Sequence, residues 1–289
     1  MEKKINRYEL LEEIGRGGAG IVYKARDTKL NRIVALKILE KRNIRPEEVQ
    51  RFIREAQIIA SFKHNNIVTI HDIAEDESNI FFSMDLEEGD TLEKLVAVRG
   101  RFSEKEALSI ILKVAKVLQV VHAKNIVHRD IKPSNIMITA SRDIKVLDFG
   151  TAKTGNETTL TRTGAFIGTI AFAAPEQFNQ AKYVDIRSDI YNLGATFYYI
   201  VRGETPYKGV AMEMMYQHCF SPVPSLGNTV SQHTNQMFQK MMAKKLEERY
   251  QNPTELIEQI LLCQSKDIRD RVEKADLPLW TNYKTEERR

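Results

Sequence analysis

The pattern of hydrophobic and polar positions changes along the chain and predicts two kinds of structure. In the first part, apolar or β-branched residues alternate with polar ones between glycine and asparagine turns, which is typical of strands. One helix interrupts them at residues 46–62, where Pro46 suits the first turn and apolar positions recur every three or four residues. The predicted strands cover residues 8–14, 21–27, 32–39, 67–74 and 79–86.

Beyond residue 87 the pattern becomes mainly helical. The segment 103–124 begins with the capping box Ser103-Glu104-Lys105-Glu106 and continues as a strongly amphipathic helix. Further helices are predicted at 185–202, 211–219, 231–244 and 253–263, and short strands at 136–139 and 144–147.

These elements predict an α+β fold with two lobes. The small lobe, residues 1–86, is mostly β with one helix, and the larger lobe, residues 87–264, is mostly α. A short linker near residues 85–90 joins them. The charged segment 265–289 is expected to be a loosely held tail or linker.

Composition narrows the class of protein. The chain has 289 residues, 42% of them hydrophobic and 28% charged, as in soluble globular proteins. Its net charge of +4 is scattered, so we expect no nucleic-acid binding. A polar N-terminus and the lack of a long apolar run predict a cytoplasmic protein, with a membrane anchor beyond residue 289 as the open alternative. Cys219 and Cys263 lack any ligand spacing, which indicates idle thiols.

Two neighbouring motifs carry the groups needed for phosphoryl transfer. His128-Arg129-Asp130-Ile131-Lys132-Pro133-Ser134-Asn135 places a carboxylate, a lysine and an amide on one short loop, and Asp148-Phe149-Gly150 adds a second carboxylate. Asp130 can orient an acceptor hydroxyl and accept its proton, while Lys132 offsets charge on the travelling phosphate. Asn135 and Asp148 can hold magnesium. The ordered set therefore predicts phosphoryl transfer from a nucleotide to a hydroxyl.

A glycine-rich segment lies between two predicted strands. Gly15-Arg16-Gly17-Gly18-Ala19-Gly20-Ile21-Val22 offers backbone N–H groups that can approach phosphate oxygens closely. A dinucleotide-binding fold would place such glycines between a strand and a helix, so strands on both sides indicate a β-hairpin flap. A plain hairpin turn is the alternative, but it would not explain so many glycines.

Lys37 lies in the predicted strand that contains Val34-Ala35-Leu36-Lys37 and is expected to face inward. A buried lysine needs an anion, and Glu55 on the predicted helix is the best candidate within the chain. Glu47 and Glu48 are alternatives, but their place in the first helical turn is better explained by the helix dipole. A Lys37–Glu55 pair would direct the ammonium at the α- and β-phosphates. A surface lysine on a strand is the simpler alternative.

Taken in order, these elements resemble the protein kinase family over residues 8–263. The form Asp130-Ile131-Lys132-Pro133-Ser134-Asn135 is similar to the catalytic loop of serine/threonine kinases. Pro175-Glu176-Gln177 and Ser188-Asp189-Ile190-Tyr191 resemble bacterial kinases of the eukaryotic-like (Hanks) type. The matching elements are the glycine loop, Ala35-Leu36-Lys37, Glu55, His128-Arg129-Asp130, Lys132, Asn135, Asp148-Phe149-Gly150, Ala174-Pro175-Glu176, Asp189 and Arg249.

The resemblance implies an ATP-dependent protein serine/threonine kinase with the bilobal kinase fold. The implied catalytic residues are Asp130, Lys132, Lys37 and Glu55, and the implied ligands of Mg²⁺, with Mn²⁺ as the second choice, are Asn135 and Asp148. The implied nucleotide-binding residues are Ile14, Gly15, Gly17, Gly20, Val22, Ala35, Lys37, Met84, Asp85, Glu87 and Met137.

Within the nucleotide site the resemblance implies distinct roles. Met84 would be the gatekeeper, and the backbone of Asp85 and Glu87 would meet the adenine edge. The adenine ring would be enclosed by Val22, Ala35 and Met137.

Two further roles in the large lobe are structural. Glu176 and Arg249 are expected to form a buried ion pair. Asp189 is expected to tether the backbone of the catalytic loop.

The threonine-rich segment 151–169 implies a regulatory switch. Arg129, beside the catalytic aspartate, needs a counter-charge in the active state, and a phosphothreonine supplies nearly two negative charges. By resemblance to bacterial relatives, Thr161 and Thr163 are the expected autophosphorylation sites. Thr169 is expected instead to contact the catalytic aspartate and lysine. An unmodified polar loop is the alternative.

Two other functions share this fold. A pseudokinase scaffold is disfavoured because Lys37, Asp130, Asn135 and Asp148 are all present. A small-molecule kinase is disfavoured by Ala174-Pro175-Glu176 and the long segment before it, which serve a peptide substrate. The expected partners are therefore ATP and protein substrates, and bacterial relatives imply weak homodimers that pair through the small lobe.

Overall fold

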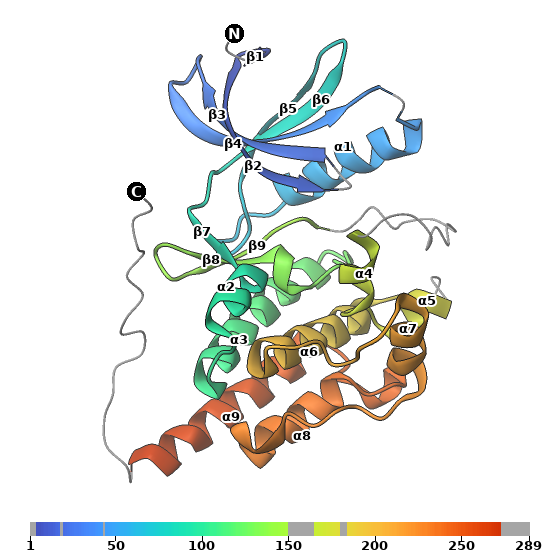
Figure 1. Ribbon diagram of the computed structural model, residues 1–289. Coiled ribbons are helices and arrows are strands. Elements are labelled where there is room, and N and C mark those ends of the chain that lie inside the picture. The colour runs from blue at the N-terminus through green and yellow to red at the C-terminus, as the bar shows by residue number, and fades with distance from the viewer. Residues whose placement is uncertain (1–3, 18–19, 43, 150–164, 180–183, 273–289) are drawn as a thin grey trace.

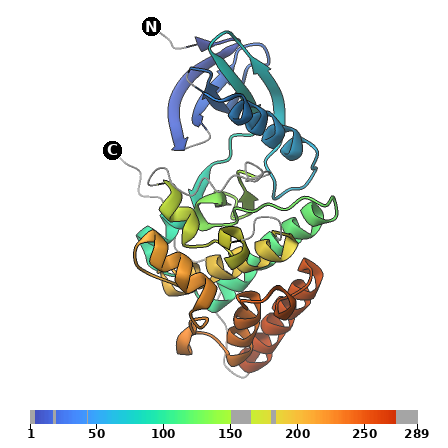
Figure 2. The same cartoon turned by 90° about the vertical axis from the view of Figure 1, so that its right-hand side faces the viewer.

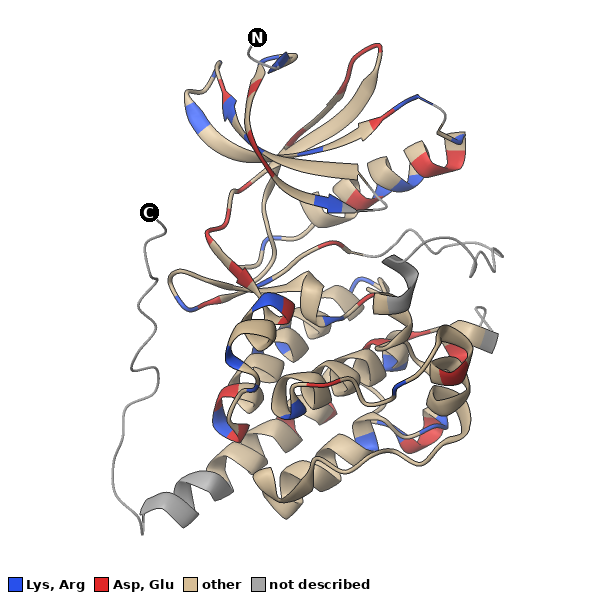
Figure 3. Cartoon of the chain, in the orientation of Figure 1, with Lys and Arg blue, Asp and Glu red and all other residues tan. Residues whose placement is uncertain are grey.

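The computed structural model describes residues 4–17, 20–42, 44–149, 165–179 and 184–272. Figure 1 shows a sheet-rich small lobe above a helical large lobe, which confirms the predicted two-lobed α+β fold. Basic and acidic residues are interspersed over both lobes (Figure 3). In the part of the chain that the structure describes, no helix combines the length and the apolar character that a bilayer span requires.

The small lobe is built on one antiparallel sheet with the strand order β1-β2-β3-β4-β6-β5. All five strands predicted in this lobe are present, and the two-residue β1 is too short for its pattern to reveal it. The strands are β1 (Lys4–Ile5), β2 (Tyr8–Gly17), β3 (Gly20–Asp27), β4 (Arg32–Glu40), β5 (Ile70–Glu75) and β6 (Asn79–Met84).

Helix α1 (Pro46–Ala60) lies across one face of this sheet, as the view turned by 90° shows (Figure 2). Its first turn follows the sequence prediction, because Pro46 stands at the start and the Glu48 carboxylate accepts the backbone N–H of Arg45 at 3.1 Å. Phe52 and Ile59 are buried. The ring of Phe52 packs against that of Phe82 on β6, with 4.9 Å between the ring centroids.

The large lobe packs its helices around one hydrophobic core. Helix α3 buries residues at the helical period, and the central helix α6 is buried over most of its length. A second sheet, β7-β8-β9, lies beside the linker: β7 (Gly89–Thr91), β8 (Ile136–Thr139) and β9 (Ile144–Val146). The helices are α2 (Leu92–Arg99), α3 (Glu104–His122), α4 (Ala165–Ile170), α5 (Pro175–Asn179), α6 (Ile186–Arg202), α7 (Ala211–Phe220), α8 (Gln232–Met241) and α9 (Pro253–Val272).

Two parts of the large lobe differ from the sequence prediction. The short elements β7, α2, α4 and α5 were not predicted, because each is too brief to show a clear period. Helix α9 continues to Val272, so the expected tail is helical over its first eight residues, 265–272. The apolar pattern stops near Cys263, but residues 264–272 include neither glycine nor proline, so nothing in them ends the helix.

Candidate active site

A cavity of about 200 Å³ lies between the lobes and is lined by residues of both. Eight of the residues predicted to contact a nucleotide line it: Ile14, Gly15, Val22, Ala35, Met84, Asp85, Glu87 and Met137. Ile59, Val68, Phe82, Leu86 and Leu147 also line it and were not predicted. Phe82 could have been found, because it lies two positions before Met84 on the same face of β6.

The glycine-rich segment forms the β2–β3 hairpin, in which Gly15 pairs with Val22 and Gly17 with Gly20. Gly20 has a φ of +122°, and a Cβ there would lie 2.3 Å from the backbone oxygen of Ile38. Gly20 is therefore needed first for the close approach of β3 to β4. Gly15 lines the cavity, whereas Gly17 and Gly20 are not among its lining residues.

Lys37 of β4 connects the small lobe to the large one. Its Nζ lies 2.8 Å from Oε1 of Glu55 on α1 and 2.7 Å from Oδ1 of Asp148. Lys37 and Glu55 are buried, whereas the Asp148 side chain is 56% exposed and faces the opening between the lobes. The ion pair expected between Lys37 and Glu55 is present, and Asp148 shares the same ammonium.

The two carboxylates that share the Lys37 ammonium have pKa values shifted in opposite directions. Burial alone would lower the pKa of Lys37, but Asp148 and Glu55 outweigh it and raise that pKa. Burial raises the pKa of Glu55 to about 7 against the attraction of Lys37, and the Asp148 charge adds to the rise. Desolvation opposes ionisation of Asp148 as well, but Lys37 holds its pKa below the ordinary value. Asp148 is therefore the carboxylate that stays ionised at the cavity.

The catalytic loop brings two polar side chains, Lys132 and Asn135, to Asp130. Lys132 Nζ lies 2.9 Å from the Asp130 carboxylate. The Asn135 amide donates to the Asp130 carboxylate at 3.0 Å and to its backbone oxygen at 2.9 Å. Lys132 also donates to the hydroxyl of Thr169 at 2.9 Å, so Thr169 reaches the aspartate through the lysine.

The backbone of this loop is held from α6. The buried Asp189 carboxylate accepts the N–H groups of His128 at 2.8 Å and Arg129 at 2.7 Å, as expected for the predicted tether. Arg129 has a φ of +66°, an uncommon value for a residue with a side chain, and these bonds help to hold it there. Burial lowers the pKa of His128, whose neutral ring accepts the Asp130 N–H and contacts Phe149.

Asn135 and Asp148 are the predicted metal ligands. The N–H side of the Asn135 amide faces Asp130, which directs its oxygen elsewhere, and Asp148 offers an ionised carboxylate at the cavity. The described residues contain no cluster of three or more His, Cys, Asp or Glu that could hold a metal ion by itself. One amide oxygen and one carboxylate nevertheless fit Mg²⁺, which takes few protein ligands and completes its shell with phosphate oxygens and water.

Residues 85–87 of the linker line the cavity. Its acidic side chains are tied elsewhere, since Asp85 pairs with His71 at 2.9 Å and Glu87 with Lys145 at 2.6 Å. The Asp85 N–H donates to the Thr69 oxygen at 3.0 Å, so the Asp85 carbonyl is the group left to meet a ligand.

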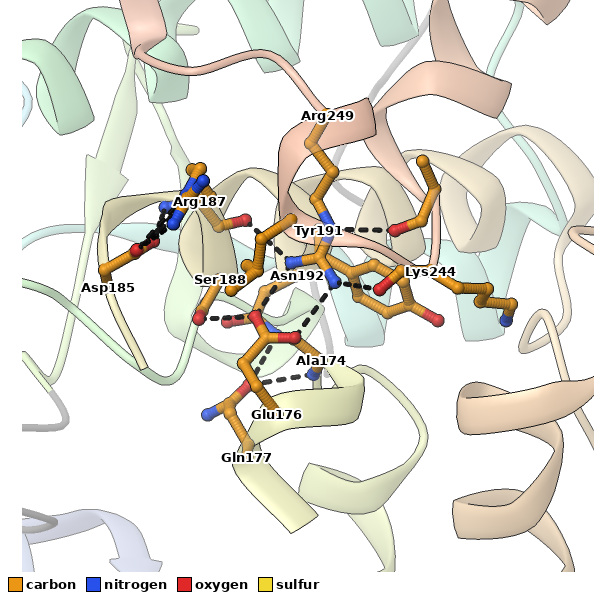
Figure 4. Close-up of polar contacts among 12 residues, drawn as sticks. Ala174, Glu176, Gln177, Asp185, Arg187, Ser188, Tyr191, Asn192, Lys244 and Arg249 are labelled. Carbon is orange, nitrogen blue, oxygen red and sulfur yellow. Dashed lines mark hydrogen bonds and ion pairs between the residues drawn. The ribbon is translucent and has the colours of Figure 1, made fainter. Parts of the chain in front are cut away.

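The ion pair expected between Glu176 and Arg249 is present (Figure 4). Two guanidinium nitrogens reach the carboxylate at 2.7 and 2.9 Å, and Ser188 donates to it at 2.6 Å. Thr161 and Thr163, the expected regulatory sites, lie outside the described residues.

Comparison with known proteins agrees with this geometry. Residues 8–266 match the family model described as protein kinase domain. Over 270 residues the chain is 38% identical to a "Probable serine/threonine-protein kinase" of Clostridium acetobutylicum, covering 92% of this chain and 41% of that protein. It is 37% identical over 261 residues to serine/threonine-protein kinase PknB of Mycobacterium leprae, covering 87% and 42%. The chain thus spans about two fifths of the length of these curated relatives. It belongs to the protein kinase family.

Proposed function

We propose that the chain is the catalytic domain of a protein serine/threonine kinase that transfers the γ-phosphoryl group of ATP to serine or threonine hydroxyls of proteins. The observation that carries this proposal is the chain of charges beside the interlobe cavity. Asp148 lines the cavity and pairs with Lys37 at 2.7 Å, while Lys132 lowers the pKa of Asp148 and lies 2.9 Å from Asp130. The names of the curated relatives support the same activity.

In this proposal the lining of the cavity binds the nucleotide. Val22 and Ala35 cover the adenine from the small lobe and Met137 supports it from the large lobe. Met84 is the gatekeeper, and the backbone of Asp85 and Glu87 meets the adenine edge. Lys37 grips the phosphates, and Glu55 sets its direction by their 2.8 Å ion pair.

The transfer itself needs positioned charges more than covalent chemistry. Asp130 accepts a hydrogen bond from the acceptor hydroxyl and orients its oxygen. As the new bond from this oxygen to the γ-phosphorus forms, the bond from that phosphorus to the β–γ bridging oxygen breaks, ADP leaves, and Asp130 takes the hydroxyl proton. Lys132, held 2.9 Å from Asp130, offsets the negative charge on the phosphoryl oxygens. Asn135 and Asp148 would hold a divalent cation, Mg²⁺ in preference to Mn²⁺. When bound, that cation would neutralise charge on the phosphates.

The test is phosphoryl transfer to a generic protein substrate with radiolabelled ATP. The Asp130→Asn variant should lose at least about 100-fold in rate while still binding ATP, because it keeps the shape of the residue but not its basicity. Asp76→Asn, which alters an aspartate that caps the β5–β6 turn, serves as the matched control and should retain activity. ATP binding without transfer by the parent protein would instead indicate a pseudokinase. Transfer to small molecules alone would indicate a small-molecule kinase.

We further infer that at least one of Thr161 and Thr163 is autophosphorylated. The support is the place of Arg129, whose backbone is bonded to Asp189 directly before the catalytic aspartate. A phosphate near this arginine would hold the segment beside the site. Mass spectrometry should find one or both threonines phosphorylated in the parent protein and neither in Asp130→Asn. Active parent protein that is unmodified at both positions would contradict this.

We also infer weak homodimers that pair through the small lobe. The exposed apolar side chains of Leu11, Ile33 and Ile73 on its strands support this inference. Sedimentation equilibrium should show concentration-dependent association that Ile33→Asp weakens. A monomer at every concentration would contradict the pairing.

A further inference from the structure

Gln177 lies where two functional segments of the large lobe meet. It follows the buried Glu176 on α5, yet its side chain turns toward the segment before the helix (Figure 4). Its Oε1 accepts the backbone N–H of Ala174 at 2.8 Å and the Nδ2 group of Asn192 at 2.8 Å. Its Nε2 donates to the backbone oxygen of Arg129 at 2.9 Å. The side chain therefore bonds the catalytic loop and the segment before α5 at once.

The Arg129 oxygen belongs to the peptide that joins Arg129 to Asp130. The N–H of Arg129 is held by Asp189 at 2.7 Å, and its carbonyl is held by Gln177. Because Arg129 has a φ of +66°, its two peptides would relax readily without such anchors. Gln177 thus holds the peptide group directly before the Cα atom that carries the Asp130 side chain.

The other partners of Gln177 hold the segment 169–174. This segment begins at Thr169, which bonds Lys132, and therefore flanks the place where the proposed function puts the acceptor hydroxyl. Asn192, which bonds Gln177, also donates to the Phe172 carbonyl at 2.8 Å. Gln177 and Asn192 therefore set the position of this segment relative to α6.

We propose that Gln177 is a positioning residue that couples the Asp130 peptide to the acceptor-binding segment 169–174. The inference rests on the proposed kinase function. An amide is required at this position, because one side of the group must accept two N–H donors while the other donates to a carbonyl. Glutamate matches its shape but cannot donate, and would set a carboxylate oxygen against the Arg129 oxygen.

The test compares Gln177→Glu with Gln239→Glu. Gln239 also donates its amide N–H to a backbone oxygen in the large lobe, that of Pro224 at 2.7 Å, but its partners lie on another loop. Both variants therefore lose the donation from a side-chain amide to the backbone. In Gln177→Glu, kcat for a peptide acceptor should fall about tenfold or more, because small displacements of reacting groups cost rate steeply. The Kd for ATP should stay within about twofold of the parent value, since Gln177 is not among the residues that line the cavity.

The outcomes separate the two proposals. A kcat of Gln177→Glu within about twofold of the parent, or an equal loss in Gln239→Glu, overturns the positioning role and leaves the kinase function standing. A parent protein without any transfer overturns both. If Gln177→Glu does not fold, Gln177→Met replaces it, because methionine has a similar length and brings no charge. The same loss of kcat with unchanged ATP binding is expected from it, and parent-like turnover overturns the role.

Discussion

Replacing Arg249 with methionine should strongly destabilise the large lobe, because it leaves a buried carboxylate without its cation. The Arg249 side chain is fully buried and that of Glu176 is 8% exposed. Besides its two bonds to Glu176, the guanidinium donates to the backbone oxygens of Ala243 at 2.7 Å, Lys244 at 3.1 Å and Arg187 at 3.2 Å. The substitution therefore removes an ion pair and three carbonyl partners together.

Removing one partner of a buried ion pair costs about 3–5 kcal/mol. The bond from Ser188 still satisfies one Glu176 oxygen, but three carbonyls lose a donor, so we expect about 4 kcal/mol for Arg249→Met. That is a large share of a typical free energy of unfolding of about 5–15 kcal/mol. The double variant Glu176→Gln with Arg249→Met should be more stable than Arg249→Met alone, because it leaves no uncompensated charge.

The measurement is urea unfolding monitored by far-UV circular dichroism. The free energy of unfolding is calculated from the midpoint and the slope of the transition. Lys208→Met provides the control, since it also removes a cation from an ion pair, here the exposed 2.6 Å contact with Glu204. Its midpoint should match the parent. A loss below about 1 kcal/mol in Arg249→Met, the range of exposed pairs, would refute the reasoning.

Three further predictions concern the cavity. Lys37→Met should abolish phosphoryl transfer and leave the far-UV spectrum unchanged. The control Lys41→Met, which alters a lysine just beyond β4, should retain activity. Parent-like transfer by Lys37→Met would contradict the role assigned to Lys37. Ala35→Leu should raise the KM for ATP about tenfold or more by filling the cavity, and an unchanged KM would count against the adenine site. Because the pKa of Glu55 is about 7 and its charged form sets Lys37, kcat/KM for ATP should fall as pH drops from 8 to 6. Glu55→Gln should have lower activity and lack this acid limb, and a limb that persists in it would assign the titration to another group.

Only part of the candidate active site could be predicted from local sequence patterns. The catalytic loop and the Asp148 motif were recognisable because their functional groups stand a few positions apart on one short segment, and such spacing depends on local geometry alone. The expected pairs Lys37–Glu55 and Glu176–Arg249 followed from a resemblance and from the need of a buried charge for a partner. The local spacing could not show that Asp148 also bonds Lys37, because 111 positions separate them.

By itself the sequence determined the element types, the two lobes and the identity of the chemical groups. Periods of two and 3.6 residues express which face of each element is buried, and these are local properties. Only the tertiary structure decided that Gly20 is required by the approach of β4 and that the Gln177 amide joins two distant segments. These features depend on which surfaces meet after the chain folds, and contacts between distant segments leave no periodic trace in the sequence.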